Sequence, residues 1–478
     1  MRLVLLVIFI SFVPPVLARP GPEDGAPPRQ PARPPNIILI LADDLGYGEL
    51  GCYGQRKIRT PNLDRVAAEG ARFTRYYAGS PVCAPSRSTL LTGLHTGHTF
   101  IRDNRELATE GQLALPADTR TLPRLLANAG YATGMVGKWG LGGPGSSGEP
   151  GRQGFQHWFG FLCQREAHNY YPTHLWRNGG RIDLEGNTPG NLTGRHYVQD
   201  LFVDEIRSFL DSHKDVPFFL YLPFTIPHLS IQTTDQDAAP YLGLWDDPPY
   251  DGKKGYLPNP APRAGYAGMI SRLDRDIGLI LAQVRDLGLD DRTIILFASD
   301  NGPTYDRIGG SDSEFFNSAA GLRGLKGSLF EGGIRVPLIV RWPGRIAPGL
   351  VSDHAAAAYD LAPTLLDLAG VQTPAGLDGV SFAPTLLGQR SQPAHEFLYW
   401  EFPSYGGQQA LQMGRYKAVR RGLLKAEAAI ELFDLQTDER ETTDIAGQHP
   451  EAVAQMRAIM TREHTPSAEF PFPALDRP

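Results

Sequence analysis

Two apolar segments, far apart in the chain, both end in a pair of oxygen-bearing side chains. Residues 36–44 read NIILILADD, and residues 293–301 read TIILFASDN. Runs that are apolar at every position, without alternation, are typical of strands buried on both faces of a parallel sheet. Residues 216–224 (VPFFLYLPF) and 336–344 (VPLIVRWPG) have the same character. The chain is therefore expected to build a large, mixed, mostly parallel sheet with both faces covered.

Helical patterns separate these strands, and the helices are expected to cover the two faces of the sheet. The segment that opens with Thr60 and Pro61 has a helix-start signature. Residues 121–130 end in Gly130, which is a helix-stop signal. Residues 266–288 repeat apolar side chains at helical spacing. Strands that alternate with helices predict an α/β sandwich.

The pattern of predicted secondary structure changes after about residue 391. The segments EFLYWEF, RYKAVRR and IELFDL are short strand candidates, and a helical pattern follows near residues 449–463. We expect an α/β domain over residues 36–390 and a small α+β C-terminal domain with an antiparallel sheet over residues 391–478.

The first 35 residues indicate export. Residues 1–18 contain one arginine, an apolar run and a small-residue cleavage pattern, as a secretory signal peptide does. A membrane anchor is the alternative, but Pro14 and Pro15 interrupt the short apolar run. Residues 19–35 predict a Pro-rich linker. We expect a secreted or periplasmic protein, lysosomal in a eukaryote, without stable membrane insertion.

The cysteine count and the charge limit the partners. Export places the three cysteines in an oxidising compartment, and an odd count leaves at least one thiol unpaired. A disulfide between Cys52 and Cys163 is one possible pairing, and it would leave Cys83 as the unpaired thiol. The net charge of −6, with acids and bases interspersed, gives no sign of a nucleic-acid-binding surface.

The two acidic strand ends are expected to meet. Ligands of open α/β sheets bind outside the carboxyl ends of the strands, where Asp43, Asp44, Asp300 and Asn301 would converge if the strands are neighbours. Either pair alone could simply begin a turn. The same arrangement on two strands favours a metal site, because crowded carboxylates require a cation. Oxygen ligands select a hard ion, Ca²⁺ or Mg²⁺.

Cys83 stands at a predicted helix start. Pro85 suits a first helical turn, and Gly93 ends the segment SRSTLLTG that follows. Free backbone N–H groups and the helix dipole favour an anion at such a position. Arg87 adds a planar fork of donors for anionic oxygens.

The segment CAPSRSTLLTG, residues 83–93, resembles the type I sulfatase signature C-x-P-S-R-x-x-x-L-x-x-G. Further blocks in family order cover nearly the whole chain: NIILILADDLGYGELGCYG, GYATGMVGKWGLG, FTIPHLS, LFASDNGP and GLRGLKGSLFEGGIRVPLIVRWPG. Within the family, the chain is similar to the arylsulfatase A and N-acetylgalactosamine-6-sulfatase subgroup. The resemblance implies an alkaline-phosphatase-like α/β sandwich with a small C-terminal sheet domain.

The resemblance also implies a nucleophile and a metal. Cys83 would be converted to Cα-formylglycine by a formylglycine-generating enzyme before folding is complete. One Ca²⁺, or Mg²⁺, would be held by Asp43, Asp44, Asp300, Asn301 and the modified residue 83. One hydroxyl of the hydrated aldehyde would attack sulfur, which a thiol does poorly because its thiosulfate ester has no easy exit.

Four further residues receive roles from the resemblance. Arg87 would hold the nucleophile and the metal region in place. Lys138 and Lys326 would bind sulfate oxygens and stabilise charge in the transition state. His228 would bind sulfate and pass a proton to the leaving oxygen.

The sequence departs from the family at one position. The family often reads G-K-W-H-L-G and uses its histidine as a base, whereas this chain has Gly140 at that place. His168, in the aromatic-flanked segment EAHNYYP, is a candidate to replace it. His95 and His98, which follow the nucleophile segment, are weaker candidates.

The substrate is expected to be a sulfated saccharide, with aryl sulfates as artificial substrates. Loops 142–195 and 231–262 are expected to line the pocket rim. Their aromatic residues suit sugar faces: Trp158, Tyr170, Tyr171, Trp176, Trp245 and Tyr250. Two alternatives remain open, a phosphomonoester, phosphodiester or phosphonate hydrolase of the same superfamily and an inactive sulfatase-fold binding protein.

Overall fold

The computed structural model describes residues 33–107, 110–425 and 428–476. Residues 34–478 form one compact unit. The predicted signal peptide and almost all of the predicted linker lie outside the described residues, so both stay predictions. The helices that the structure describes include none long and apolar enough to cross a membrane.

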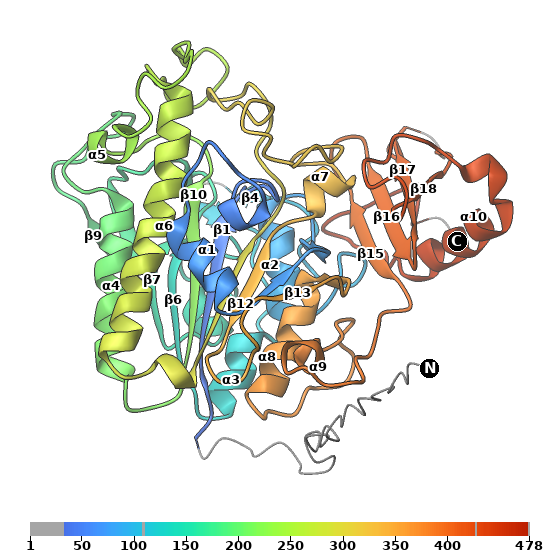
Figure 1. Ribbon diagram of the computed structural model, residues 1–478, viewed down its shortest axis with the longest axis horizontal. Helices are drawn as coiled ribbons and strands as arrows, with labels where there is room; N and C mark the ends of the chain where they lie inside the picture. The colour runs from blue at the N-terminus through green and yellow to red at the C-terminus, as the bar shows by residue number, and fades with distance from the viewer. Residues whose placement is uncertain (1–32, 108–109, 426–427, 477–478) are drawn as a thin grey trace, which may run out of the picture. The chain divides into compact units, whose positions relative to one another are not determined.

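A ten-stranded sheet forms the centre of the molecule (Figure 1). Its strands, in spatial order, are β13 (Leu350–Ser352), β2 (Ala71–Phe73), β12 (Leu338–Arg341), β11 (Thr293–Ser299), β1 (Asn36–Asp43), β10 (Phe218–Pro227), β6 (Ala132–Lys138), β7 (His157–Phe161), β8 (His174–Arg177) and β9 (Gly180–Asp183). The five strands from β11 to β7 run parallel, and antiparallel strands continue the sheet on both sides. This is the mixed, mostly parallel sheet that the apolar runs predicted.

The central register places four strand ends at one edge. Strand β1 lies between β11 and β10, with Ala42 opposite Ser299 and Asp43 opposite Pro227. Strand β6 pairs in parallel with β10 on the other side. Because these strands all run in one direction, the residues that follow β1, β11, β10 and β6 gather at the same carboxyl edge.

Two layers of helices cover the sheet, as Figure 1 shows. Helices α1 (Pro61–Ala68), α4 (Val198–His213) and α6 (Pro262–Asp286) share one apolar core with one face of the sheet. Helices α2 (Cys83–Thr92), α3 (Leu122–Asn128), α8 (Leu361–Leu368) and α9 (Ala383–Leu386) share a second core with the other face. The short helices α5 (Asp235–Ala238) and α7 (Glu331–Ile334) lie in loops. The predicted α/β sandwich is therefore confirmed.

A four-stranded antiparallel sheet occupies the C-terminal part. It consists of β15 (Leu398–Phe402), β16 (Gln408–Met413), β17 (Tyr416–Arg421) and β18 (Glu431–Asp434), with α10 (Pro450–Arg462) packed against it. Strand β16 was not among the predicted strands. Buried contacts join this sheet to the segments that flank α2: Trp400 Nε1 donates to the Ala78 carbonyl at 2.8 Å, and Arg102 pairs with Glu401 at 2.7 Å. Two small pairs, β3 (Tyr76–Tyr77) with β14 (Ala356–Ala357) and β4 (Glu106–Leu107) with β5 (Gly111–Gln112), complete the strands.

The suggested disulfide between Cys52 and Cys163 is absent, since all three cysteines are free thiols. Cys52 lies beyond β1 beside α1, where its backbone N–H donates to Asp64. Cys163 follows β7, the third strand from β1. The two residues are thus anchored to separate parts of the sheet edge, and burial raises the pKa of both thiols.

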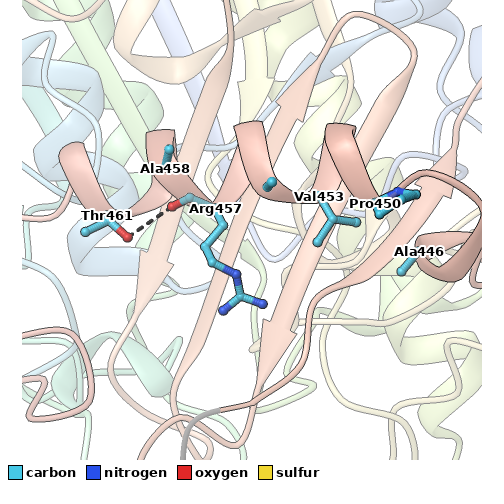
Figure 2. Close-up of a pocket in the computed structure, with 7 residues that line it drawn as sticks. Ala446, Pro450, Val453, Arg457, Ala458 and Thr461 are labelled. Atoms are coloured by element: carbon cyan, nitrogen blue, oxygen red, sulfur yellow. Dashed lines mark hydrogen bonds between the residues drawn. The ribbon is translucent and has the colours of Figure 1, made fainter.

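A shallow pocket lies along α10 (Figure 2). Its lining is mainly apolar, with Ala446, Pro450, Val453 and Ala458 alongside Arg457, whose carbonyl accepts a hydrogen bond from Thr461. It contains none of the predicted site residues.

Candidate active site

The acidic residues at the ends of β1 and β11 meet as the sequence predicted. All four are buried: Asp43, Asp44, Asp300 and Asn301. The Asp44 backbone N–H donates to Asp300 Oδ1 at 3.1 Å, and Asn301 Nδ2 donates to Asp44 Oδ1 at 2.8 Å. Asp44 has a φ of 66°, an uncommon left-handed conformation that turns the chain directly after the strand.

Cys83 is the first residue of α2 and is 1 % exposed. Its Sγ lies 3.2 Å from Asp43 Oδ1, so the thiol and the carboxylate cluster form one site. The Ala84 N–H, at the open end of the helix, donates to Asn104 Oδ1 at 2.9 Å. Gly93 ends the helix with a φ of 71°. Burial and the Asp43 charge raise the pKa of the Cys83 thiol, so the unmodified thiol is not an activated nucleophile.

Arg87 braces the cluster from within α2. Its Nε and Nη2 donate to Asp300 Oδ2 at 3.1 and 2.8 Å, and its Nη1 donates to the Lys138 carbonyl. Nη2 also lies 3.5 Å from Asp43 Oδ2. The guanidinium therefore fixes two carboxylates and the end of β6 at once, as its planar fork of donors permits.

Two lysines approach the thiol from different elements. Lys138, the last residue of β6, places Nζ 2.6 Å from Asp43 Oδ2 and 3.7 Å from Cys83 Sγ. Lys326, from the long loop after β11, places Nζ 2.6 Å from Asp44 Oδ1 and 3.5 Å from Cys83 Sγ. Two ammonium groups beside the residue 83 side chain suit an anion such as a sulfate group.

His228 follows β10 and faces the same cluster. Its Nδ1 donates to the Leu229 carbonyl at 2.6 Å, which leaves Nε2 3.6 Å from Asp44 Oδ2. Burial and the Lys326 charge lower the pKa of His228, so its imidazole is neutral. The hydrogen bond at Nδ1 thus fixes both the ring orientation and the tautomer.

His168 lies beside this histidine. The two rings stack with centroids 4.5 Å apart and 13° between their planes. Burial, together with His228, lowers the pKa of His168. The structure therefore brings His168 to the site side of the sheet, while its contribution to the reaction stays a prediction.

The cluster crowds three carboxylates together and leaves one oxygen acceptor unused. Burial raises the pKa of Asp43, but the charges of Lys138, Arg87 and Lys326 outweigh it and hold that pKa well below the usual range. Burial and the Asp43 charge raise the pKa of Asp300 to about 6. Asn301 Oδ1 is a buried acceptor without a hydrogen-bond partner among the described residues. An unpaired acceptor beside three crowded carboxylates fits a hard, oxygen-liganded cation.

Gln164 fills the space at Gly140, which sequence reasoning missed. A Cβ atom on Gly140 would lie 2.0 Å from Gln164 Nε2, and Gly140 has a φ of 79°. Gln164 is 4 % exposed, and its Nε2 has no hydrogen-bond partner within the described part of the chain. The side chain that replaces the family histidine in space is thus an amide, which donates hydrogen bonds but does not act as a base.

The weaker candidates His95 and His98 are engaged elsewhere. Their rings stack on each other at 4.2 Å. His95 Nε2 lies 3.3 Å from Glu463, beyond α10, and His98 Nδ1 lies 2.9 Å from Asp378. These contacts tie the segment after α2 to the C-terminal part of the chain rather than to the cluster around Cys83.

The aromatic residues expected at the pocket rim are mostly structural. Trp158, Tyr170 and Tyr171 are buried, and Trp176 and Trp245 pack against the two cores. The loops are long, but their aromatic side chains turn inward to cover the sheet. Two aromatic residues that were not assigned to the rim also lie near the site. The ring centroid of Tyr256 is 6.2 Å from that of His228, and Tyr305 lies against Gly327, next to Lys326.

Comparison with known proteins gives the same picture. The sulfatase family profile matches residues 35–371, and a profile described as N-sulphoglucosamine sulphohydrolase, C-terminal, matches residues 325–465. The chain is 35 % identical over 420 residues to human arylsulfatase A, covering 81 % of this chain and 75 % of the relative. It is 34 % identical over 415 residues to dog N-acetylgalactosamine-6-sulfatase, covering 82 % and 72 %.

A solved structure shares the fold. Ps i-CgsB in complex with k-i-k-neocarrahexaose superposes with a TM-score of 0.75 at 28 % identity, covering 90 % of this chain and 92 % of that one. The alkaline-phosphatase-like sandwich expected from the sequence is thus confirmed. The buried carboxylates, the thiol at the start of α2 and the surrounding cations occur in a chain that the family profile matches over most of its length. The chain belongs to the sulfatase family and is a sulfuric ester hydrolase.

Proposed function

We propose that this protein hydrolyses a sulfate monoester of a saccharide, using Cα-formylglycine made from Cys83 and a bound Ca²⁺ ion. The observation that carries the proposal is the position of Cys83, whose Sγ lies within 3.9 Å of Asp43, Asp44, Lys138 and Lys326. The relatives named arylsulfatase A and N-acetylgalactosamine-6-sulfatase support sulfate ester hydrolysis. The neocarrahexaose complex supports a saccharide.

The residues that would hold the cation are Asp43, Asp44, Asp300, Asn301 and the modified residue 83. All of them offer oxygen, the donor that Ca²⁺ and Mg²⁺ prefer. When bound, the ion supplies positive charge that polarises the nucleophile and a sulfate oxygen. Arg87 keeps Asp300 and Asp43 in position for this, through the contacts at 2.8 and 3.5 Å.

The modified residue 83 explains why a buried cysteine occupies this position. The thiol itself has a raised pKa, because burial and Asp43 disfavour the thiolate. A hydrated aldehyde supplies an oxygen nucleophile and also a route by which sulfate leaves without attack of water on sulfur. This side chain stands at the start of α2, where the positive end of the helix dipole favours negative charge.

The remaining residues bind the sulfate and move protons. Lys138 and Lys326 approach residue 83 from two sides, so they would hold sulfate oxygens and stabilise the charge that develops in the transition state. His228 presents Nε2 to the site, since Nδ1 is committed to the Leu229 carbonyl. In the resting site this tautomer leaves Nε2 without a proton, so Nε2 would have to take up a proton when the anionic ester binds and would then pass it to the leaving oxygen.

Maturation and location follow from the same proposal. A formylglycine-generating enzyme would act on the CAPSR segment before folding, because Cys83 is 1 % exposed once the chain has folded. The signal peptide predicted over residues 1–18 would direct the protein to the periplasm or the outside of the cell, or to the lysosome in a eukaryote.

Turnover of matched esters tests the proposal. The protein, produced together with a formylglycine-generating enzyme, is assayed on an aryl sulfate and on the corresponding aryl phosphate and phosphonate. We expect the sulfate to be the preferred substrate and Cys83→Ala to be inactive on it. A clear preference for the phosphate or phosphonate would assign the chain to the alternative hydrolase class. No turnover by fully converted, calcium-loaded protein would favour a binding protein.

A further inference from the structure

Two tyrosines from different parts of the chain meet beside Lys326. Tyr305 follows β11 by six residues, and Tyr405 lies in the turn between β15 and β16 of the C-terminal sheet. Their ring centroids are 6.0 Å apart with 33° between the planes, and their hydroxyl groups share a hydrogen bond. A Cβ on Gly327 would lie 3.4 Å from Tyr305 and 3.5 Å from Tyr405. Both rings therefore lie against the backbone next to Lys326.

This pair is close to the sulfate pocket. Lys326 Nζ is 3.5 Å from Cys83 Sγ, and the two tyrosine rings lie against the backbone of the next residue, Gly327. On the other side of Asp44, His228 lies 3.6 Å from the carboxylate, and Tyr256 lies near His228. The groups around residue 83 are charged, so the organic part of a bound ester would extend away from them, and the tyrosine pair next to Lys326 is a surface available to it.

Tyr405 is held exposed by specific contacts. It is 62 % exposed, although its φ of 52° is unfavourable for a residue with a side chain. Ser404, one residue before it, is hydrogen-bonded to Asp103, and Gln408 donates to the Gly327 carbonyl at 2.7 Å. Tyr405 also stacks on the buried Phe402 at 5.5 Å. The turn is thus fixed to the loop that carries Lys326, with the tyrosine ring facing solvent at that place.

We propose that Tyr305 and Tyr405 form a platform that binds the sugar ring carrying the sulfate ester; this rests on the proposed function. Aromatic faces pack against the apolar face of a pyranose, and a phenol hydroxyl provides a polar contact at the edge. The neighbours of the pair are polar, including Ser404, Asp103 and Asp306, which suits sugar hydroxyls better than an extended apolar alcohol. The C-terminal sheet would then contribute directly to substrate specificity.

Binding to an inactive variant tests the platform without turnover. In the Cys83→Ala background, calorimetry measures the affinity for inorganic sulfate, N-acetylgalactosamine 6-sulfate and a carrageenan tetrasaccharide. We expect Tyr405→Ala to weaken binding of at least one sulfated sugar by about three- to tenfold, the range for an aromatic contact. Inorganic sulfate should bind unchanged, and Tyr405→Phe should keep most of the sugar affinity.

Tyr416→Ala is the matched control, because Tyr416 lies on β17 of the same sheet and packs against His449. It should leave sugar binding unchanged. Equal sugar affinity with and without the Tyr405 ring would overturn the platform. Binding of inorganic sulfate but of neither sulfated sugar would overturn the saccharide assignment. Failure to bind even inorganic sulfate, in calcium-loaded protein, would instead contradict the proposed function on which the platform rests.

Discussion

Gln164 Nε2 lies 2.0 Å from the position that a Cβ on Gly140 would take. The two residues follow neighbouring strands, β6 and β7, and the Gly140 N–H donates to the Leu162 carbonyl at 3.1 Å. Their backbones are therefore fixed close together, and only one of the two positions can carry a side chain into this space. In this chain the absence of a side chain at Gly140 and the position of the Gln164 amide therefore depend on each other.

Restoring the histidine alone should therefore fail. Gly140→His would clash with the buried amide and force a side chain onto a φ of 79°, so we expect a clear drop in melting temperature. The double variant Gly140→His/Gln164→Ala removes the clash and should recover most of that loss, leaving a backbone cost of about 1–2 kcal/mol. Thermal unfolding of both variants checks this. A single variant as stable as the unmodified protein would show that Gln164 moves aside freely.

His168→Ala tests the histidine that stacks on His228. A general base contributes typically about 10²- to 10⁴-fold to turnover, so a loss of kcat in that range with little change in KM would identify a proton-transfer role. A rise in KM with kcat preserved would identify substrate binding. His168→Asn retains a polar group of similar reach and serves as the comparison. Unchanged kcat and KM in both variants would remove His168 from the site.

Calcium should stabilise the folded protein through the carboxylate cluster. A ligand that binds only the folded state adds about 3 kcal/mol when its free concentration is about a hundredfold above Kd. We expect chelation to lower the melting temperature and added Ca²⁺ to restore it. Asp300→Asn should weaken this response, whereas Asp290→Asn should not, because Asp290 precedes β11 and pairs with Arg341 rather than with the cluster. A melting temperature insensitive to Ca²⁺ in the unmodified chain would contradict the metal site.

The contact between His98 and Asp378 should make stability depend on pH. The hydrogen bond with Asp378 raises the pKa of His98, against the effect of burial, with Glu463 adding to the rise and Arg102 opposing it. A group whose pKa is higher in the folded state stabilises fully below its unfolded pKa, about 6.5, and loses this effect as pH rises through the folded pKa.

His98→Gln should therefore cost stability at pH 5.5 and little at pH 9. Glu463 remains ionised across this window, since the hydrogen bond from His95 helps to lower its pKa to about 2. Chemical denaturation of the two proteins at both pH values measures the effect. An equal loss of stability at pH 5.5 and pH 9 would show that the contact does not depend on the charge of His98.

The sequence predicted the features that local patterns encode. Continuous apolar runs identify buried strands, so the central strands and the meeting of Asp43 with Asp300 could be expected. The start of α2 at Cys83 follows from Pro85 and its end from Gly93. Residues with a strong local signature were thus placed correctly before any tertiary contact was known.

Features that depend on packing across the sheet could not be predicted in this way. Gln164 reaches the space at Gly140 only because β6 and β7 are neighbours. Tyr405 lies against Gly327 and Tyr305 only because the turn after β15 packs on the loop after β11. The aromatic residues assigned to the rim, such as Tyr170, are of the types found at binding surfaces. In the fold most of them pack into the apolar cores that cover the sheet.

The mass of the peptide that contains residue 83, measured together with turnover, tests the central claim most directly. The protein is produced with and without a formylglycine-generating enzyme, and each preparation is assayed on an aryl sulfate. We predict that turnover rises in proportion to the fraction of residue 83 that has the mass of formylglycine, and that protein carrying the unmodified thiol is inactive. Equal turnover by preparations with and without the conversion would contradict the account.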